Sequence, residues 1–199
     1  ILFRMVAQCF FLPILFAHIL NKNTLQDQTI HQSYHSRDKD NPKPKQVTAQ
    51  HCRAIGLYNE NYFRKIIALM KEGGVGLVSD PHTGPLHARV RDLAAAGIPV
   101  ALGQDDIADA YYPYGECNML QIAFLASHLL WMTTFNDIEL LYDMITTSAA
   151  KVLGIQNHEL KVGGNADLVV LDEEDVYHAI WHHRAPVYVI KDGVDVTLK

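Results

Sequence analysis

Three stretches between Val47 and Asp106 share a pattern that limits the folds open to this chain. Each is a short apolar run that ends in polar residues, at 47–51, 74–82 and 98–106. A segment with apolar residues at helical spacing follows the first run, and a shorter helical segment follows the second. The strands therefore recur at a spacing of roughly 25–30 residues, the size of a βαβ unit. The sequence predicts an α/β fold whose strands are parallel and whose second strand is buried on both faces.

The helical segments carry recognisable start and stop residues. The first covers 58–74, where Asn59 or Asn61 could begin the helix and Gly73 could end it. The second covers 90–97 and closes at Gly97. A later apolar segment, 117–132, predicts a buried helix.

The C-terminal part of the sequence has a different pattern of apolar and turn residues. The segment 136–154 predicts a helix with a capping box of Asn136 and Glu139 and an end at Gly154. Short strands are then expected within 160–172 and 185–198, with GG and DG turns and a brief helical link over 175–183. We expect an α/β body over 47–154 and a small β-subdomain over 155–199.

The first 46 residues differ in composition from the rest. Residues 1–20 are apolar but interrupted by Gln8, Pro13 and His18, so no uninterrupted run reaches the ~20 residues of a spanning helix. Residues 21–46 are polar and include the helix-hostile NPKPK, which is typical of a linker. We expect 1–46 to be poorly ordered and the protein to be cytoplasmic, with an anchor or signal segment as the open alternative.

Composition narrows the classes of function. A net charge of -5 and a pI near 6.1 give no basic surface for a phosphate backbone, which argues against nucleic-acid binding. The three cysteines are far apart and form no CxxC pair, which excludes a disulfide scaffold and a zinc ribbon. Eleven histidines favour a metal or proton-transfer site.

Polar side chains follow all three predicted strands. His51 ends the first, Asp80 and His82 end the second with His87 close behind, and Asp105 with Asp106 ends the third. Parallel strands bring their carboxyl ends to one edge, so these groups are expected to converge there. Each of them alone could also be a packed histidine or a helix-capping aspartate.

A tyrosine-rich loop follows the paired aspartates. Tyr111, Tyr112 and Tyr114 suit the binding of a flat ring, although packing of the loop explains them equally well.

The stretch from VTAQHCRAIGLYNENYF to GQDDIADAYYPYG, with the tail KVGGNADLVVLD and APVYVIKDG, resembles the cytosine deaminase branch of the amidohydrolase superfamily. The resemblance implies strands six to eight of a TIM-type (β/α)8 barrel and a small β-sandwich subdomain. It also implies a divalent metal, zinc or iron, which activates a water for hydrolysis of C–N bonds other than peptide bonds. The partner would be a small cyclic, pyrimidine-like substrate.

The resemblance assigns roles to individual residues. Asp105 matches the aspartate of strand eight, a metal ligand and proton shuttle, and His51 matches the catalytic histidine of strand six. Asp106 matches a substrate-binding carboxylate, and Tyr111 takes the place of a tryptophan that covers the pyrimidine. Gln104 stands where bacterial cytosine deaminases have a histidine.

Two family motifs are missing from the sequence: the HxH of strand one, and the histidine of strand five with its acid three residues later. The resemblance starts at Val47, and residues 1–46 resemble nothing in the family. The metal-ligand set is then incomplete, and we expect a truncated product or a fragment that is inactive on its own. The alternative is a non-catalytic interaction module that pairs with a partner chain carrying the missing barrel half; a homo-oligomer is also open.

Overall fold

A three-stranded parallel sheet forms the centre of the molecule. The computed structural model describes residues 47–105, 110 and 113–197, so the predictions for residues 1–46 lie outside it. The strands are β1 (Val47–Gln50), β2 (Val75–Ser79) and β3 (Val100–Leu102), in the order β1-β2-β3. Both pairings are parallel, with Ala49 opposite Leu77 and Leu77 opposite Val100. The mixed α/β class and the parallel strands are therefore confirmed.

Helices connect these strands, as the spacing predicts. Helix α2 (Glu60–Gly73) and helix α3 (Val90–Ala95) lie in the two crossovers, each preceded by a 3-10 turn, η1 (Arg53–Leu57) and η2 (Pro81–Thr83). The side chain of Asn59 accepts a hydrogen bond from the Tyr62 backbone N–H, so Asn59 is the N-cap of α2. The left-handed residue at the other end is Gly74, with φ 63°, one position later than expected.

Both faces of the sheet are covered. Leu77 and Val100 belong to the main hydrophobic core, together with Ile66 and Met70 of α2. On the other face, Ala101 packs with Val152 of helix α6 in a smaller apolar cluster. Burial on both faces explains why the second strand is an almost continuous apolar run.

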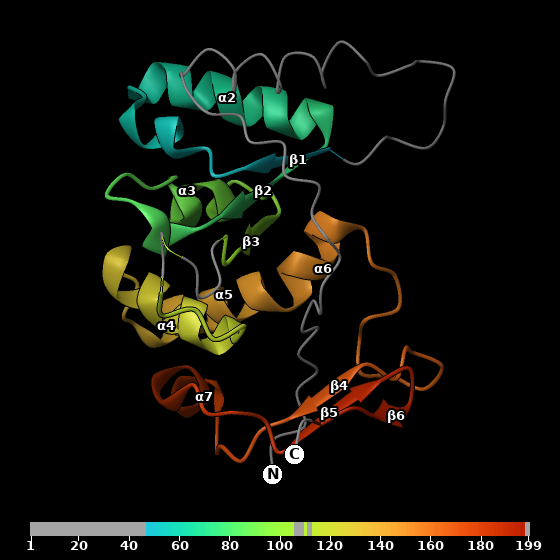
Figure 1. Cartoon of the computed structure of the whole chain (residues 1–199). Coiled ribbons are helices and arrows are strands. Elements are labelled where there is room, and N and C mark those ends of the chain that lie inside the picture. Colours follow the sequence, from blue (N-terminus) through green and yellow to red (C-terminus); the bar gives the residue numbers. More distant parts are fainter. Residues whose placement is uncertain (1–46, 106–109, 111–112, 198–199) are drawn as a thin grey trace.

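Three further helices complete the α/β body: α4 (Met119–Leu129), α5 (Phe135–Ile145) and α6 (Thr147–Leu153). In Figure 1 they lie on the opposite side of the sheet from α2. The predicted capping box of Asn136 and Glu139 is wrong. The box is formed by Thr134 and Asp137, because Thr134 has the extended conformation of an N-cap while Asn136 is already helical. The single helix predicted over 136–154 is also wrong, because the backbone leaves the helical conformation at Thr146 (φ −130°, ψ −98°) and divides the segment into α5 and α6. Gly154, with φ 69°, is the C-cap of α6.

The C-terminal segment forms a second, antiparallel sheet. Its strands are β4 (Leu168–Val170), β5 (Tyr188–Lys191) and β6 (Val194–Asp195), and helix α7 (Val176–His182) links the first two. Asp192 and Gly193 both have positive φ in the β5–β6 turn, as expected for a DG hairpin. No strand forms over residues 160–162 of the described chain, where the sequence pattern predicts one.

Within residues 47–105, 110 and 113–197, no helix is both long and apolar enough to cross a membrane.

Buried side chains at the centre of the parallel sheet should contribute strongly to the free energy of unfolding. Leu77 is fully buried in the middle strand, so Leu77→Ala should lower the free energy of unfolding by about 3 kcal/mol through lost burial and a residual cavity. The matched control is Leu160→Ala, at a side chain that is 58% exposed, which should change it by less than about 0.5 kcal/mol. Urea unfolding followed by circular dichroism measures both. Equal effects of the two substitutions would contradict this assignment of the core.

Candidate active site at the carboxyl edge of the sheet

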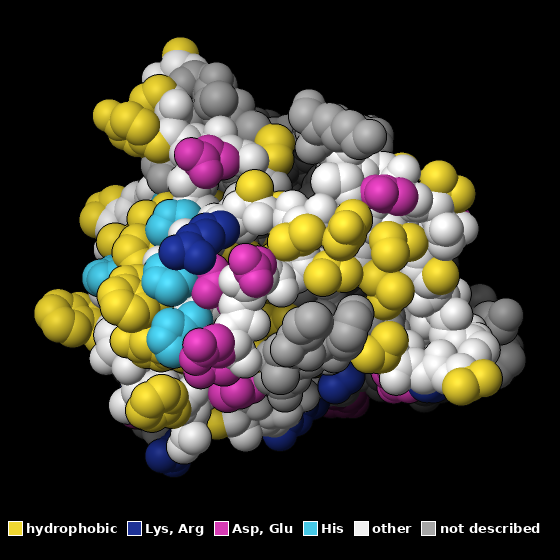
Figure 2. All heavy atoms as spheres, turned by 90° about the horizontal axis from the view of Figure 1, so that it is seen from below, with side chains coloured by type: hydrophobic (Ala, Val, Ile, Leu, Met, Phe, Trp, Pro, Cys, Tyr) yellow, Lys and Arg dark blue, Asp and Glu magenta, His cyan; other side chains and the backbone are white. Residues whose placement is uncertain are grey.

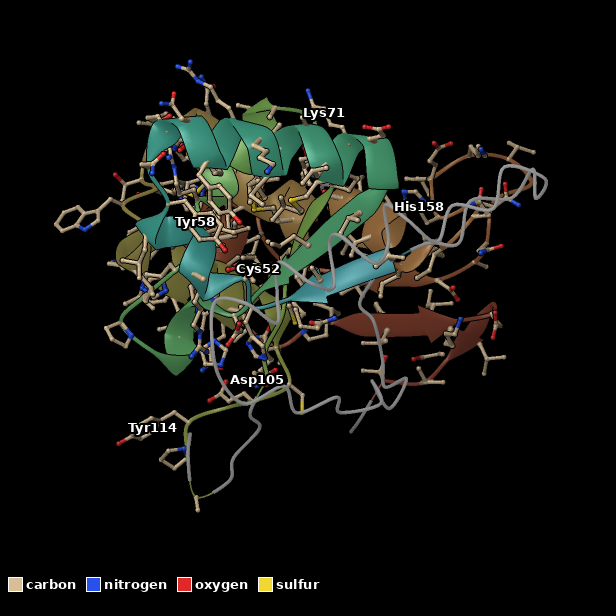
Figure 3. All side chains as sticks on the ribbon, turned by 90° about the horizontal axis from the view of Figure 1, so that it is seen from above. Cys52, Tyr58, Lys71, Asp105, Tyr114 and His158 are labelled. Carbon is tan, nitrogen blue, oxygen red and sulfur yellow. The ribbon has the colours of Figure 1, made fainter. Side chains whose placement is uncertain are left out.

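One histidine and two carboxylates meet where the parallel strands end. His51 directly follows β1, Asp80 directly follows β2, and Asp105 comes three residues after β3. One ligand atom from each lies within 4.8 Å of the others. Figure 3 shows Asp105 and Cys52, the residue after His51, at the same end of the sheet. The parallel topology thus brings together residues that are up to 54 positions apart (105 − 51 = 54).

The backbone leaves the sheet sharply at this edge. His51 has φ 60° and Asp105 has φ 63°, both in the left-handed region that residues other than glycine rarely adopt. The His51 N–H still donates to the Val78 carbonyl, at 2.9 Å, so the turn begins directly at the end of the β1–β2 pairing. Such conformations cluster at functional sites because surrounding contacts must hold them.

Asp80 connects the groups of the site. Its carboxyl group is 5% exposed and takes part in two short hydrogen bonds, one at each oxygen. His51 Nδ1 lies 2.6 Å from Oδ1, and Arg53 Nη2 lies 2.6 Å from Oδ2. A buried carboxylate is tolerated only when it is paired and hydrogen-bonded, and these two partners meet that need.

The charges shift the titration of both predicted catalytic groups. The hydrogen bond between His51 and the Asp80 carboxylate raises the pKa of His51, against an opposing effect of burial. Burial raises the pKa of Asp105, and the nearby negative charge of Asp80 raises it further. Two carboxylates this close disfavour each other's ionised form, and a cation between them would relieve that cost.

The remaining predicted residues fall around this group or outside the described chain. His82 and His87 are partly buried at the same end, and burial lowers the pKa of each. Neither belongs to the metal-binding group found among the described residues. Tyr114 is 73% exposed and points away from the body of the molecule (Figure 3).

Asp106 and Tyr111, the predicted substrate-binding residues, lie outside the described residues.

The predicted convergence of His51, Asp80 and Asp105 is confirmed, but two contacts of this network were not predicted. One is the hydrogen bond between Asp80 and His51, and the other involves Arg53. Arg53 lies in the 3-10 turn after β1 and carries no motif. Its position matters because the turn returns the guanidinium to Asp80, 27 residues away in sequence.

The donor set suits a divalent metal ion only in part. His51, Asp80 and Asp105 together could hold one, and imidazole nitrogen with carboxylate oxygen is a ligand set that zinc and iron accept. Both Asp80 oxygens, however, already carry a hydrogen bond, and a guanidinium charge stands beside them. Among the described residues, His51 and Asp105 are therefore the two ligands left beside Asp80, fewer than the three protein ligands typical of catalytic zinc.

The active sites of α/β barrel enzymes lie at the carboxyl edge of the parallel strands, where this chain has a histidine and two carboxylates. A profile of the amidohydrolase family matches residues 17–197, beginning ahead of Val47. The chain belongs to the amidohydrolase family.

Two curated relatives support this assignment. N-isopropylammelide isopropyl amidohydrolase of Pseudomonas sp. (strain ADP) is 32% identical over 172 residues, which is 86% of this chain and 40% of that protein. A pterin deaminase of Rhizobium rhizogenes is 30% identical over 139 residues, 62% of this chain and 31% of that protein. The chain thus spans less than half the length of these relatives.

Solved structures share the fold. A 5-methylcytosine deaminase from Klebsiella pneumoniae, liganded with 5-fluorocytosine, superposes with a TM-score of 0.75 at 27% identity, over 89% of this chain and 45% of that one. An N-isopropylammelide isopropylaminohydrolase from Burkholderia multivorans superposes with a TM-score of 0.78 at 25% identity, over 86% and 43%. These neighbours are consistent with part of a TIM-type barrel.

The raised pKa of Asp105 makes its ionisation unfavourable for folding. The resulting loss of folding stability is absent below the ordinary aspartate pKa of about 3.9. It reaches its full size once the pH exceeds the raised pKa of Asp105 in the folded state. In metal-free buffer at neutral pH, Asp105→Asn should therefore raise the thermal unfolding midpoint, and this gain should vanish as the pH falls toward 4. Differential scanning calorimetry at several pH values measures it.

The control for that experiment is Asp192→Asn, at an exposed turn residue, which should change the midpoint little at any pH. Destabilisation by Asp105→Asn at neutral pH would contradict the repulsion between Asp105 and Asp80.

Proposed function

We propose that this chain carries the C-terminal catalytic edge of a metal-dependent hydrolase that acts on C–N bonds outside peptides. The substrate class is a small nitrogen heterocycle that loses an amino or alkylamino group, as in a cytosine deaminase. The observation that carries the proposal is the meeting of His51, Asp80 and Asp105 at the carboxyl edge of parallel strands, within an amidohydrolase-family chain. The names of the relatives support the substrate class, since they refer to ammelide, pterin and cytosine compounds.

Asp105 would hold the metal and also handle protons. A zinc or iron ion, when bound, supplies Lewis-acid chemistry that makes water a nucleophile at neutral pH. The Asp105 carboxylate would also take up a proton from water during the reaction and return it to the leaving nitrogen, which is the general acid–base role of such a group. His51 would act beside it through its Nε2 atom, because Nδ1 faces Asp80.

Asp106 and Tyr111 keep their predicted role at the substrate. Asp106 would bind the ring through its carboxylate, and Tyr111 would cover the ring face. We assign β1, β2 and β3 to barrel strands six, seven and eight, and the β4–β6 sheet to the β-sandwich subdomain. The division at 47–154 and 155–199 follows from that assignment.

The remaining metal ligands would come from a barrel half that this sequence does not match. By itself, the chain supplied with zinc or iron should release no ammonia from cytosine, because too few ligands are present. A chimera supplies the rest: the front part of the Klebsiella 5-methylcytosine deaminase joined to residues 47–199. This chimera should retain metal and hydrolyse cytosine compounds, N-isopropylammelide or pterin, which ammonia and amine assays distinguish.

Asp105→Asn in the active chimera should lower kcat by roughly 10²–10⁴-fold, the range typical of a lost acid–base group. Asp192→Asn is the control and should leave kcat unchanged, since this side chain is 79% exposed in the β5–β6 turn. A folded, metal-loaded chimera with no activity on any of these compounds would contradict the proposed function.

An interaction module is the second candidate, and one observation favours it. Among the described strands, β1 and β3 are the edges of the parallel sheet, so each has backbone groups available for pairing with another strand. A partner carrying the front of the barrel would bind there. Size-exclusion chromatography of the chain mixed with the separate front part of the Klebsiella enzyme separates the candidates: a stable complex that lacks activity supports the module alone.

A further inference from the structure

The contacts of Asp80 determine which nitrogen of His51 carries the proton. A neutral imidazole has one N–H donor and one acceptor nitrogen, and the partner of either nitrogen decides which is which. Asp80 Oδ1 lies 2.6 Å from Nδ1, within a carboxyl group that is almost fully buried.

Arg53 fixes the hydrogen-bonding direction of this carboxyl group. Arginine carries only donors, so Asp80 must accept on Oδ2, where Arg53 Nη2 lies at 2.6 Å. The guanidinium also compensates the buried negative charge. Asp80 is then a carboxylate that accepts on Oδ1 as well, which requires the donor N–H to be on His51 Nδ1.

We propose that Asp80 is a positioning residue that fixes His51 in the Nδ1–H tautomer, with Arg53 holding Asp80 in place. The lone pair of His51 is thereby assigned to Nε2, the ring nitrogen that faces away from Asp80. Carboxylate–histidine pairs orient metal-ligating and catalytic imidazoles in the same manner. The catalytic meaning of this tautomer rests on the proposed function, whereas the tautomer itself does not.

Among the described residues, Asp80 is the hydrogen-bonding partner of the His51 ring. The His51 side chain is 41% exposed, and its backbone leaves the strand in a left-handed conformation. Without Asp80, the ring could rotate and exchange its two tautomers. A site that uses Nε2 gains from removing that freedom in advance.

The same chain offers a matched pair for comparison. His178 Nδ1 lies 2.9 Å from Asp175 Oδ1 at the start of α7, which is exposed to solvent. Figure 2 shows histidine side chains gathered beside acidic and basic ones on the face seen from below, the end of the molecule where α7 lies in Figure 1. Asparagine is as good an N-cap as aspartate, so Asp175→Asn should leave α7 intact.

The tautomer is read directly by long-range ¹H–¹⁵N NMR of the histidine-labelled chain. The measurement uses residues 1–199 with a chelator present, at a pH well above the histidine titration, and His51→Gln identifies the His51 signals. We expect wild-type His51 to show an N–H-type shift at Nδ1 and a lone-pair-type shift at Nε2. A proton on Nε2 in the wild-type chain overturns the proposal, whatever the variants do.

Asp80→Asn should invert the tautomer. Arg53 would engage the amide oxygen of the new asparagine, whose NH₂ group would then donate to Nδ1 and leave the proton of His51 on Nε2. Asp80→Ala should give a mixture of both forms. Asp175→Asn should leave His51 unchanged. An unaltered His51 tautomer in a folded Asp80→Asn chain contradicts the proposal.

The NMR shifts of His51 and the activity of the chimera test the tautomer and the proposed function independently. Neither metal nor turnover enters the NMR measurement, so an inactive chimera with the expected His51 shifts refutes only the proposed function. An active chimera in which Asp80→Asn changes neither the His51 tautomer nor kcat refutes only the positioning role.

Discussion

The buried carboxylate of Asp80 is the interaction on which the arrangement of the site depends. It sits at the end of the middle strand, between the ends of β1 and β3, and is 5% exposed. Burying one charge requires partners, and it obtains them from His51 and Arg53 in the segment that follows β1. The same charge acts on Asp105 beyond β3. The Asp80 side chain therefore interacts with residues that follow both neighbouring strands of the sheet.

The position of the Asp80 carboxylate explains why ionisation of Asp105 is unfavourable when no cation is bound between the two groups. Asp80 has a guanidinium and an imidazole as partners, whereas Asp105 faces the charge of Asp80 and the loss of solvent. Natural proteins commonly give up stability in this way at sites that must bind a charged group or move a proton. The left-handed backbone of His51 and Asp105 adds local strain at the same place.

Periodicity was enough to predict the sheet, because alternating apolar runs and helical segments at βαβ spacing admit few other folds. It also placed His51 and Asp105 at one edge, since the direction of parallel strands follows from that topology. The N-cap of α5 was harder to predict from the sequence. It is Thr134 and not Asn136, because Thr134 is the residue with an extended backbone conformation. The contact of Arg53 with Asp80 spans 27 residues and depends on the path of a 3-10 turn, so no sequence pattern could reveal it.

An NMR titration of His51 tests most directly whether these side chains share one site. The carboxylates of Asp80 and Asp105 both raise the pKa of His51. In the metal-free chain, the pKa of His51 should therefore exceed the ordinary histidine value of about 6.5 and should fall in Asp105→Asn. A His51 pKa that is the same in both proteins would contradict the placement of Asp105 beside His51 in one active site.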